Sequence, residues 1–338
     1  MADTIPRSKV SIVTPSFNQA EFLEETILSV LGQDYPYTEY IIIDGGSSDD
    51  SVDIIRQYED QLAYWVSEPD RGQTDAINKG CRLATGDIIA YINSDDVYCP
   101  LAISKVVNYF MKSPDVSMVY GDALHIDREG ALMSIVRTGE IDLVRYLSNQ
   151  FYLPQPAVFF KRRVLDEIGY FDPHYNLAMD KEFWTRVLLN FKGGYLPDFL
   201  AKLRIYTEAK SSSQKCKYLE EHLMMLDWVF SNTHLLCDRK DVPADIMQLR
   251  PFIYGSIFFT GGLEYLKMRQ IKPACDNIMK GLRLNPRQIL ALPLYWSLFM
   301  ALFGYDISHR IQSVSRSYHN SKDSAFTQLS HEYTSPSR

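Results

Sequence analysis

Two adjacent carboxylates, Asp95 and Asp96, follow a short apolar run of the sequence, with two residues in between. The run, residues 87–92, has the length and composition of a buried strand, so the pair would leave a sheet at its carboxyl edge. Two ionised carboxyl groups repel each other, and oxygen ligands of this kind suit Mg²⁺ or Mn²⁺ when a substrate diphosphate completes the shell. The pair therefore predicts an enzyme that acts on a nucleotide diphosphate. The alternative is an ordinary Asp-Asp turn after a strand.

Three further polar segments follow predicted strands in the same way. They are Pro-Ser-Phe-Asn at 15–18, Asp-Gly-Gly-Ser-Ser-Asp at 44–49 and Glu-Pro-Asp-Arg-Gly at 68–72. Ligands of open α/β folds bind outside the carboxyl ends of the strands. These segments and the acidic pair are therefore expected to form one site.

The elements that must position these segments alternate between strand and helix up to about residue 121. Strands are expected at 10–14, 40–43, 62–66, 87–92 and 117–120, and helices at 21–31, 51–58, 74–83 and 101–111. This alternation predicts an α/β fold with a mostly parallel, doubly wound, Rossmann-like sheet flanked by helices. No Gly-x-Gly-x-x-Gly fingerprint follows the first strand, which argues against a dinucleotide-binding enzyme.

The alternation weakens after residue 121. The expected elements are a hairpin at 125–137, a strand at 155–160, and helices at 162–168, 180–189, 218–230, 246–267 and 272–284. Residues 208–217 are rich in serine and lysine and are expected to form a hinge or a loop. The predicted division is one α/β domain over residues 1–210, with halves at about 8–121 and 122–210, and a helical extension over 211–312.

The composition bounds the class of protein. The chain has 338 residues, of which 46% are hydrophobic and 23% charged, and its formal net charge is -7. These values indicate a globular protein and argue against a general nucleic-acid binder. The 5 cysteines are scattered, with no Cys-x-x-Cys pair, which suits a reducing compartment. Residues 1–7 lack the apolar core of a signal peptide, so the chain is expected to remain in the cytoplasm.

The most apolar stretch lies at residues 289–303. It is shorter than the roughly 20 residues that span a bilayer, and Pro293 interrupts it. Two interpretations stay open: a helix packed in a core, and a helix in the membrane interface, which the basic neighbours Arg283 and Arg287 would suit. The tail at 313–338, rich in serine, histidine and charge, is expected to be disordered.

Taken together, the polar segments resemble those of family 2 glycosyltransferases, which have the GT-A fold. The matching text lies at residues 11–18, 43–49, 68–72, 76–80, 84–87 and 93–96. Each motif alone is weak, but they occur in order at family-like spacing. The resemblance covers about residues 8–210. It implies a nucleotide-sugar donor, a divalent metal ion, Mg²⁺ or Mn²⁺, and inversion at the anomeric carbon. The Gln-x-x-Arg-Trp motif of processive synthases is missing, so one sugar per encounter is expected.

The resemblance implies which residues bind the nucleotide. Pro15, Phe17 and Asn18 would line the nucleotide pocket, Asp44 would accept a hydrogen bond from the base, and Arg71 would lie near the base or the diphosphate. An arginine offers planar donors to phosphate oxygens, which agrees with this role. Two alternatives remain: a turn role for Asp44 beside two glycines, and a surface ion pair of Arg71 with a carboxylate of its own loop, at position 68 or 70.

The resemblance also implies how the diphosphate and the metal are held. Asp96 would ligate the metal, and Asp95 would hold the ribose or a metal-bound water. Arg204 lies in a segment that resembles the closing loop of the family, and it would cover the diphosphate. The metal ion would neutralise the charge that builds on the departing diphosphate.

The general base implied by the resemblance is Asp180, with Glu182 as a supporting residue. Met179 stands where the family usually has a glutamate. A positioned carboxylate is what the displacement needs to take the proton of the acceptor hydroxyl. The alternative is that Asp180 only caps the helix that begins there.

The expected function is an inverting glycosyltransferase of bacterial surface polysaccharide synthesis (O-antigen, capsule or exopolysaccharide). It would act at the inner face of the cytoplasmic membrane on a sugar or lipid-linked acceptor, with a peripheral membrane contact through residues 289–303 and no nucleic-acid partner. One alternative is a sugar nucleotidyltransferase, which should carry a glycine-rich, arginine-containing loop that residues 14–17 do not provide. The other is a non-catalytic nucleotide-sugar-binding or scaffold protein, against which Asp96 and Asp180 argue.

Overall fold

The structure is a computed structural model, and it describes residues 8–206, 214–232 and 246–290. Several sequence-based predictions therefore lie outside the described residues. These are most of the predicted hinge at 208–217, nearly all of the apolar stretch at 289–303, and the whole tail at 313–338.

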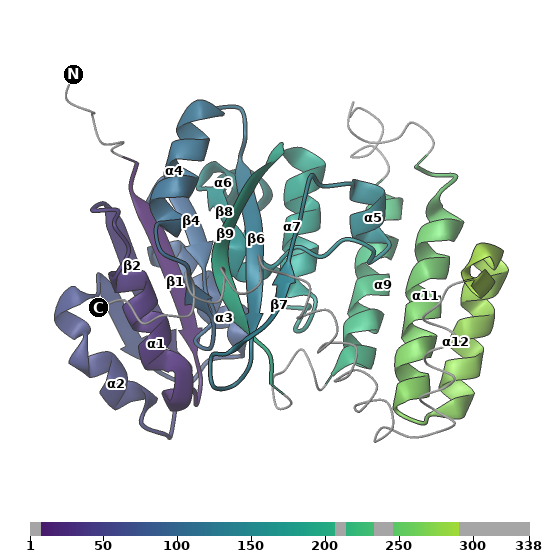
Figure 1. The fold of residues 1–338 in the computed structure, drawn as a ribbon, viewed down its shortest axis with the longest axis horizontal. Coiled ribbons are helices and arrows are strands. Elements are labelled where there is room, and N and C mark those ends of the chain that lie inside the picture. The colour runs from purple at the N-terminus through teal and green to yellow at the C-terminus, as the bar shows by residue number, and fades with distance from the viewer. Residues whose placement is uncertain (1–7, 207–213, 233–245, 291–338) are drawn as a thin grey trace, which may run out of the picture. The chain divides into compact units, whose positions relative to one another are not determined.

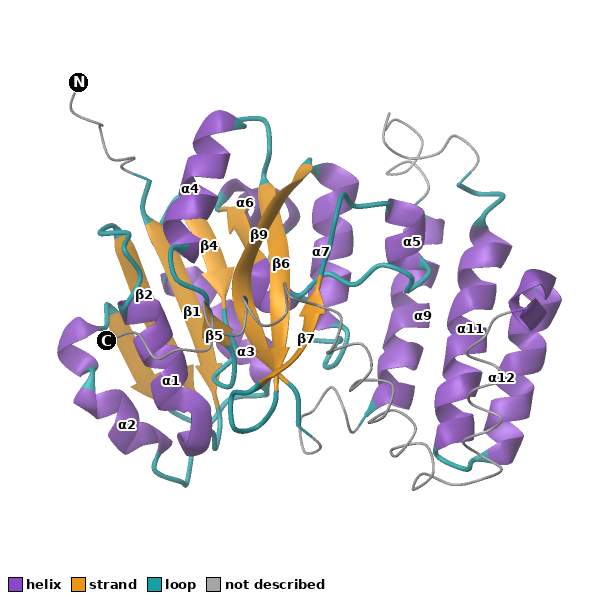
Figure 2. Cartoon of the chain, in the orientation of Figure 1, coloured by secondary structure: helices purple, strands orange, loops and turns teal. Residues whose placement is uncertain are grey.

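Four parallel strands form the first half of the sheet, in the order β3-β2-β1-β4. β2, β1 and β4 are labelled side by side in Figures 1 and 2. The strands are β1 (Val10–Ser16), β2 (Thr38–Asp44), β3 (Tyr64–Ser67) and β4 (Ile88–Tyr91). The helices between them are α1 (Ala20–Leu31), α2 (Ser51–Gln57), the short 3-10 helix η1 (Glu59–Gln61) and α3 (Gln73–Leu83). Every residue of β1 and β4 is buried, as in parallel strands that are covered on both faces. The predicted alternation is confirmed here.

The second half of the sheet is mixed. Its strands are β5 (Val97–Tyr98), β6 (Met118–Ile126), β7 (Leu132–Val136), β8 (Val158–Lys161) and β9 (Gly193–Arg204). Its helices are α4 (Ala102–Lys112), η2 (Gln155–Ala157), α6 (Arg163–Ile168) and α7 (Met179–Asn190). β8 lies between β4 and β6 and is antiparallel to both, while β6 and β9 are parallel. The predicted strand at 117–120 therefore does not pair with β4, and the first residues of the predicted strand at 155–160 form η2 instead.

Close packing of α3 against β1 brings the start of α3 to the carboxyl edge of the sheet. The two elements approach at Gly80, where an added Cβ would lie 2.3 Å from Cγ1 of Val13. Only glycine permits this distance without a shift of the helix. The first residues of α3 follow directly after β3 and the loop at 68–72, so this glycine helps to position them beside the other polar segments.

Contacts within the chain define two units, Met1–Asp142 with Phe151–Ala209, and Leu143–Gln150 with Lys210–Arg338. The helices of the second unit are α5 (Leu143–Leu147), α9 (Lys215–Ser231), α11 (Arg250–Lys267), α12 (Ile271–Leu284) and η3 (Pro286–Leu290). α11 and α12 pack closely through glycines: a Cβ on Gly281 would lie 2.7 Å from the backbone nitrogen of Phe259. Among the described residues, no helix is both long and apolar enough to cross a membrane. The domain boundary at 210 stays a prediction.

Candidate active site

Asp96 lies buried in the loop between β4 and β5, with few hydrogen bonds to its carboxylate. Its Oδ1 accepts from the backbone N–H of Arg204 at 3.1 Å, and its Oδ2 accepts from Nδ2 of Asn93 at 3.3 Å. Burial raises the pKa of the Asp96 carboxyl well above its usual range, and the neighbouring charge of Asp95 raises it further. The loop is anchored from α1, where the hydroxyl of Thr26 donates to the carbonyl of Asp96 at 2.7 Å.

Asp95 shares this environment but faces a different partner. The hydroxyl of Tyr206 donates to its Oδ2 at 2.8 Å, and burial raises the pKa of the Asp95 carboxyl despite this bond. The ring of Tyr206 rests near that of Phe22, with 5.2 Å between centroids. Tyr206 therefore holds Asp95 from the segment that follows β9.

The chemistry of this carboxylate pair fits a divalent cation. Burial raises the pKa of both carboxyl groups, and the charge of Asp95 raises that of Asp96 further, so a positive charge beside the pair would stabilise its ionised form. A metal ion would supply that charge. Among the described residues, no three His, Cys, Asp or Glu side chains gather that could hold a metal. Mg²⁺ is often bound by one or two carboxylates together with substrate phosphates and water, so Asp95 and Asp96 would suffice on the protein side.

Arg204, the last residue of β9, holds the loop that carries Asp95 and Asp96. The residue is 5% exposed, and its guanidinium donates to the carbonyls of Asp95 at 3.1 Å, Asp127 at 3.1 Å and Arg128 at 2.8 Å. It also forms an ion pair with Glu25. These contacts favour a structural role for the side chain, and the predicted contact with a diphosphate stays a prediction.

Asp44 is fully buried at the end of β2 and accepts four hydrogen bonds from the protein. The donors are the N–H groups of Gly46 at 3.1 Å and Ser47 at 2.9 Å, and the hydroxyls of Ser47 at 2.5 Å and Ser67 at 2.7 Å. These are the contacts of the turn role that the sequence left open. A hydrogen bond from a base to Asp44 stays a prediction, since both carboxylate oxygens are already engaged.

The loop after β1 presents a more open surface at the same edge. Pro15 is buried in β1, whereas Phe17 just beyond the strand is 58% exposed. Asn18 adopts a left-handed conformation, with φ of 51°, and its Oδ1 accepts from the N–H of Ser48 at 2.9 Å. The hydroxyl of Ser16 is buried and has no hydrogen-bond partner among the described residues. An exposed aromatic ring and an unpaired hydroxyl at one strand end suit a ligand-binding edge.

Arg71 lies at the surface, where its side chain is 87% exposed and forms an ion pair with Asp75 at 3.2 Å. The partner is thus neither of the carboxylates that the sequence suggested, because Glu68 pairs with Lys79 and Asp70 accepts from the N–H of Gly72 at 2.7 Å. An exposed ion pair contributes little to stability, so this arginine is available to a ligand phosphate. Its role at the donor stays a prediction.

Asp180 is the second residue of α7, and the helix N-cap is Ala178. Asp180 is therefore not the N-cap of α7, which was the alternative to its role as a base. Its Oδ1 accepts a hydrogen bond from the N–H of Lys181 at 2.7 Å. Glu182, by contrast, is 5% exposed and pairs with Arg186 through bonds of 2.6 Å and 2.9 Å. Burial raises the pKa of the Glu182 carboxyl, and Arg186 opposes that rise. Its contacts are those of a residue that holds α7 together.

Hydrogen bonds from the start of α3 connect α7 with the acidic loop. The hydroxyl of Thr74 contacts Sδ of Met179 at 2.9 Å, and Nε2 of Gln73 donates to Oδ1 of Asn93 at 2.7 Å. Asn93 in turn donates to Oε1 of Gln155 at 3.2 Å and to Asp96. Sequence reasoning missed Gln73, Thr74 and Asn93 as positioning residues, although all three lie within or next to the polar segments it selected.

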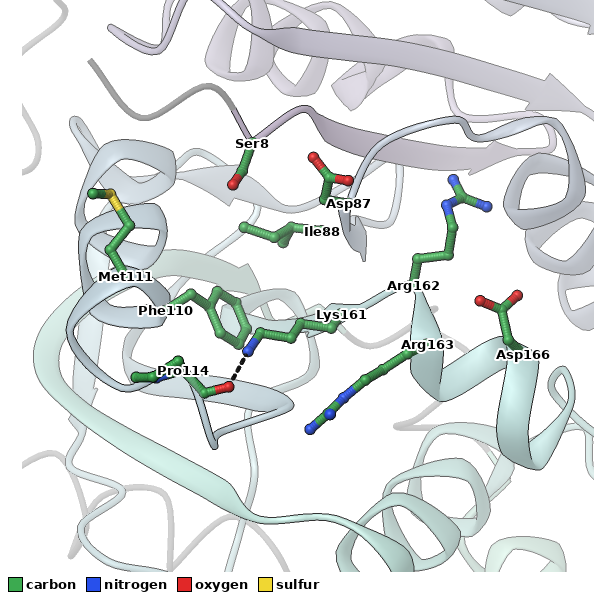
Figure 3. Close-up of a pocket in the computed structure, with 10 residues that line it drawn as sticks. All are labelled: Ser8, Asp87, Ile88, Phe110, Met111, Pro114, Lys161, Arg162, Arg163 and Asp166. Atoms are coloured by element: carbon green, nitrogen blue, oxygen red, sulfur yellow. Dashed lines mark hydrogen bonds between the residues drawn. The ribbon is translucent and has the colours of Figure 1, made fainter. Parts of the chain in front are cut away.

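The cavity in Figure 3 lies at the other edge of the sheet. It has a volume of about 480 Å³, and its lining includes Ser8 and Asp87, which precede the first residues of β1 and β4. Nζ of Lys161 donates there to the carbonyl of Pro114 at 2.7 Å. None of the predicted site residues lines this cavity. The residues predicted to bind the donor and the metal lie instead at or just beyond the carboxyl ends of strands, and Asp180 and Glu182 lie on α7.

Comparisons with known proteins bear on the family and the fold of the chain. The family model for glycosyl transferase family 2 matches residues 11–178. An uncharacterized glycosyltransferase of Mycobacterium tuberculosis is 35% identical over 182 residues, which are 53% of this chain and 69% of the relative. The structure resembles S. aureus TarS 1–349 in complex with UDP-GlcNAc, with a TM-score of 0.62, 16% identity, and coverage of 84% of this chain and 83% of TarS.

A mannosyltransferase from Pyrobaculum calidifontis in complex with GDP-Man and Mn²⁺ gives a TM-score of 0.53 at 18% identity, covering 88% of this chain and 85% of that one. Identities this low show the fold alone. The fold is that of glycosyltransferases of the GT-A type. The chain belongs to glycosyltransferase family 2.

Proposed function

We propose that this protein transfers one sugar from a nucleoside-diphosphate sugar to a hydroxyl group of an acceptor, with inversion at the anomeric carbon and with Mg²⁺ or Mn²⁺. The observation that carries the proposal is the adjacent pair Asp95 and Asp96 at the carboxyl edge of the sheet, linked by hydrogen bonds through α3 to the helix that bears Asp180. The phosphates of the sugar donor would lie at the loop of Asp95 and Asp96, and the base that takes the proton would lie on α7.

The reaction needs one bond made and one broken. The acceptor oxygen attacks the anomeric carbon while Asp180 takes its proton, and the bond from that carbon to the diphosphate oxygen breaks. A metal ion held by Asp96, with Asp95, would supply positive charge to the departing diphosphate. Arg204 keeps the loop that carries both carboxylates in place, because it binds the carbonyl of Asp95 and supplies the backbone N–H to Asp96.

The comparisons support the donor class without naming the donor. TarS is described in complex with UDP-GlcNAc and the Pyrobaculum enzyme with GDP-Man and Mn²⁺. We extend the proposal to bacterial surface polysaccharide synthesis on a sugar or lipid-linked acceptor, because family resemblance favours it. The expected place of action, the inner face of the cytoplasmic membrane, stays a prediction, as does the contact through residues 289–303.

A donor panel tests the proposal. UDP-glucose, UDP-galactose, UDP-GlcNAc and GDP-mannose are each incubated with the protein and a mixture of methyl glycosides, with Mn²⁺ or with a chelator, and nucleoside diphosphate release is measured. We expect release with at least one donor, only with the metal, and a product of inverted configuration by proton NMR. Pyrophosphate formation from a nucleoside triphosphate and a sugar phosphate would favour a nucleotidyltransferase. Donor binding without any turnover would favour the scaffold, and a retained configuration would contradict the inverting mechanism.

A further inference from the structure

Tyr152 is held open to solvent, although both of its neighbours in the chain are buried. Phe151 and Leu153 are 6% and 5% exposed, whereas Tyr152 is 52% exposed. The two buried neighbours anchor the segment on either side of the exposed ring. An exposed aromatic ring between two buried side chains leaves apolar surface in a fixed place, which a ligand can cover.

The segment that carries this ring is tied to the metal-site loop. Gln155 is 7% exposed, and its Nε2 donates to the carbonyl of Tyr91 at the end of β4 at 2.8 Å. Its Oε1 accepts from Nδ2 of Asn93 at 3.2 Å, and the same amide reaches Oδ2 of Asp96 at 3.3 Å. Tyr152 therefore stands three positions from a side chain that is bonded into the site.

The charges of both site carboxylates reach the Tyr152 hydroxyl. Burial among surrounding atoms raises the pKa of this phenol, and the carboxylates of Asp180 and Asp96 raise it further. Both carboxylates therefore act on this phenol, while half of the side chain stays open.

A histidine supports the ring. The imidazole of His125, on β6, lies with its centroid 6.2 Å from that of Tyr152, and its Nδ1 forms a 3.0 Å hydrogen bond with the hydroxyl of Ser134 on β7. Burial lowers the pKa of His125, which favours the neutral ring near pH 7. Two rings from separate segments, one fixed by a strand pair, form a small aromatic surface beside the site.

We infer that Tyr152 is a specificity-determining residue on whose ring a sugar ring of the acceptor stacks, so that the acceptor is a glycan rather than a protein side chain. The inference rests on the proposed function and names its acceptor class. A pyranose presents C–H groups on one face and hydroxyls around its edge, and tyrosine offers an apolar face with a polar tip. Stacking next to Asp180 would orient one hydroxyl of the sugar toward this base. Such positioning of the reacting groups increases the rate of transfer.

Steady-state transfer by the full chain tests the inference. The donor is the one selected from the panel, with Mn²⁺, and the acceptors are methyl glycosides and a serine- and threonine-containing peptide. For Tyr152→Ala we expect the KM for the methyl glycoside to rise about tenfold, with the donor KM within about twofold of wild type. Tyr152→Phe keeps the ring, so it should retain most of the acceptor affinity. Tyr64→Ala is the matched control, because Tyr64 is 40% exposed at the first residue of β3, away from the carboxyl edge.

The possible results separate the inference from the proposed function. A Tyr152→Ala protein with the wild-type acceptor KM, or a wild-type enzyme that glycosylates the peptide and no methyl glycoside, would overturn the acceptor assignment while leaving a working glycosyltransferase. Equal loss in Tyr152→Phe and Tyr152→Ala would assign the effect to the hydroxyl and overturn the stacking role. No donor turnover by the wild type under any condition would contradict the proposed function itself.

Discussion

At the scale of single residues, the number of hydrogen bonds distinguishes the carboxylate of Asp44 from that of Asp96. Asp44 is buried and accepts four bonds of 2.5–3.1 Å from its own loop and from Ser67. Asp96 is also buried but accepts only two bonds from described residues, at 3.1 and 3.3 Å, and stands beside a second carboxylate. A buried carboxylate with few donors is destabilising unless another positive group arrives. Asp44 thus maintains the loop, while Asp96 is suited to bind a cation.

The base assignment makes a direct prediction. Asp180→Asn keeps the shape of the side chain but removes its ability to take a proton, so kcat for transfer should fall by about 10²–10⁴-fold with donor KM little changed. Asp172→Asn is the control, since Asp172 lies before α7 and accepts bonds from His174. Initial rates of nucleoside diphosphate release with acceptor present measure both. Full transfer activity in Asp180→Asn would exclude this residue as the base.

Asn93 makes a second prediction, because it contacts Asp96 without being a proposed metal ligand. Asn93→Ala removes the hydrogen bonds from the Asn93 amide to Asp96 and to Oε1 of Gln155. The carboxylate of Asp96 then has one fewer donor and should lose its orientation. We expect the Mn²⁺ concentration for half-maximal activity to rise by about tenfold or more. Asn190→Ala, at the end of α7, should leave the metal titration unchanged. An identical metal titration for Asn93→Ala would contradict the positioning role.

Site residues could be predicted from the sequence where the chemistry allows few residue types. Their orientation depends on the three-dimensional contacts and could not be predicted in the same way. Asp96 could be selected from the sequence, because adjacent carboxylates after a buried strand cost free energy unless a positive group pairs with them. Arg204 could be placed near the site but not oriented, since nothing in the sequence indicates that carbonyls at 127 and 128 would accept its donors. The sequence did not indicate a role for Tyr152 in the site, because the exposure of its ring depends on how the two neighbouring side chains pack.

At the scale of elements, β9 shows why the second half of the sheet was harder to predict. Its sequence contains Gly193, Gly194, Pro197 and Asp198, all of which disfavour a strand. It forms because β6 supplies a partner along nearly its whole length, with register shifts around Asp122. The first half was predictable from local pattern alone, since β1, β2 and β4 are short segments with an apolar, β-branched centre between helices. Pairing with distant residues overrides local propensity in β9.

Glu39, at the second residue of β2, makes an element-scale prediction about stability. Burial opposes its ionisation, but hydrogen bonds from Lys9, Ser11 and Thr85 outweigh burial and lower its pKa to about 2. Because the folded pKa lies below the unfolded value, this contribution is present above about pH 5 and is lost as pH falls toward 2. We expect Glu39→Gln to lower the free energy of unfolding at pH 7 by about 2 kcal/mol.

Urea denaturation at pH 7 and at pH 3 measures this effect. The difference between wild type and Glu39→Gln should shrink at the lower pH, because the wild-type carboxylate then loses part of its advantage over the unfolded chain. Glu59→Gln in η1, where the side chain is exposed, serves as the control and should match the wild type at both values. A difference independent of pH would mean that the glutamate stabilises β2 by packing and not by its charge.

At the scale of the whole molecule, charge determines how a nucleotide can bind. The chain carries a formal net charge of -7, and of the two arginines assigned to the donor, Arg204 is engaged by the protein while Arg71 stands exposed beside Asp75. A diphosphate brought near Asp95 and Asp96 would meet two further negative groups. Nucleotide binding should therefore be coupled to metal binding, each increasing the affinity for the other.

Thermal unfolding of the whole chain tests this coupling. A ligand that binds only the folded protein stabilises it, by about 2.7 kcal/mol at a hundred times its Kd, so Mn²⁺ with UDP or GDP should raise Tm by about 3–5 °C. Either component alone should give a smaller shift, because the nucleotide lacks its counter-charge and the metal lacks phosphate ligands. Asp96→Ala should abolish the combined shift, whereas Asp60→Ala, exposed in η1, should retain it. A combined shift equal to the sum of the separate ones, or one that persists in Asp96→Ala, would show that nucleotide and metal do not meet at this carboxylate pair.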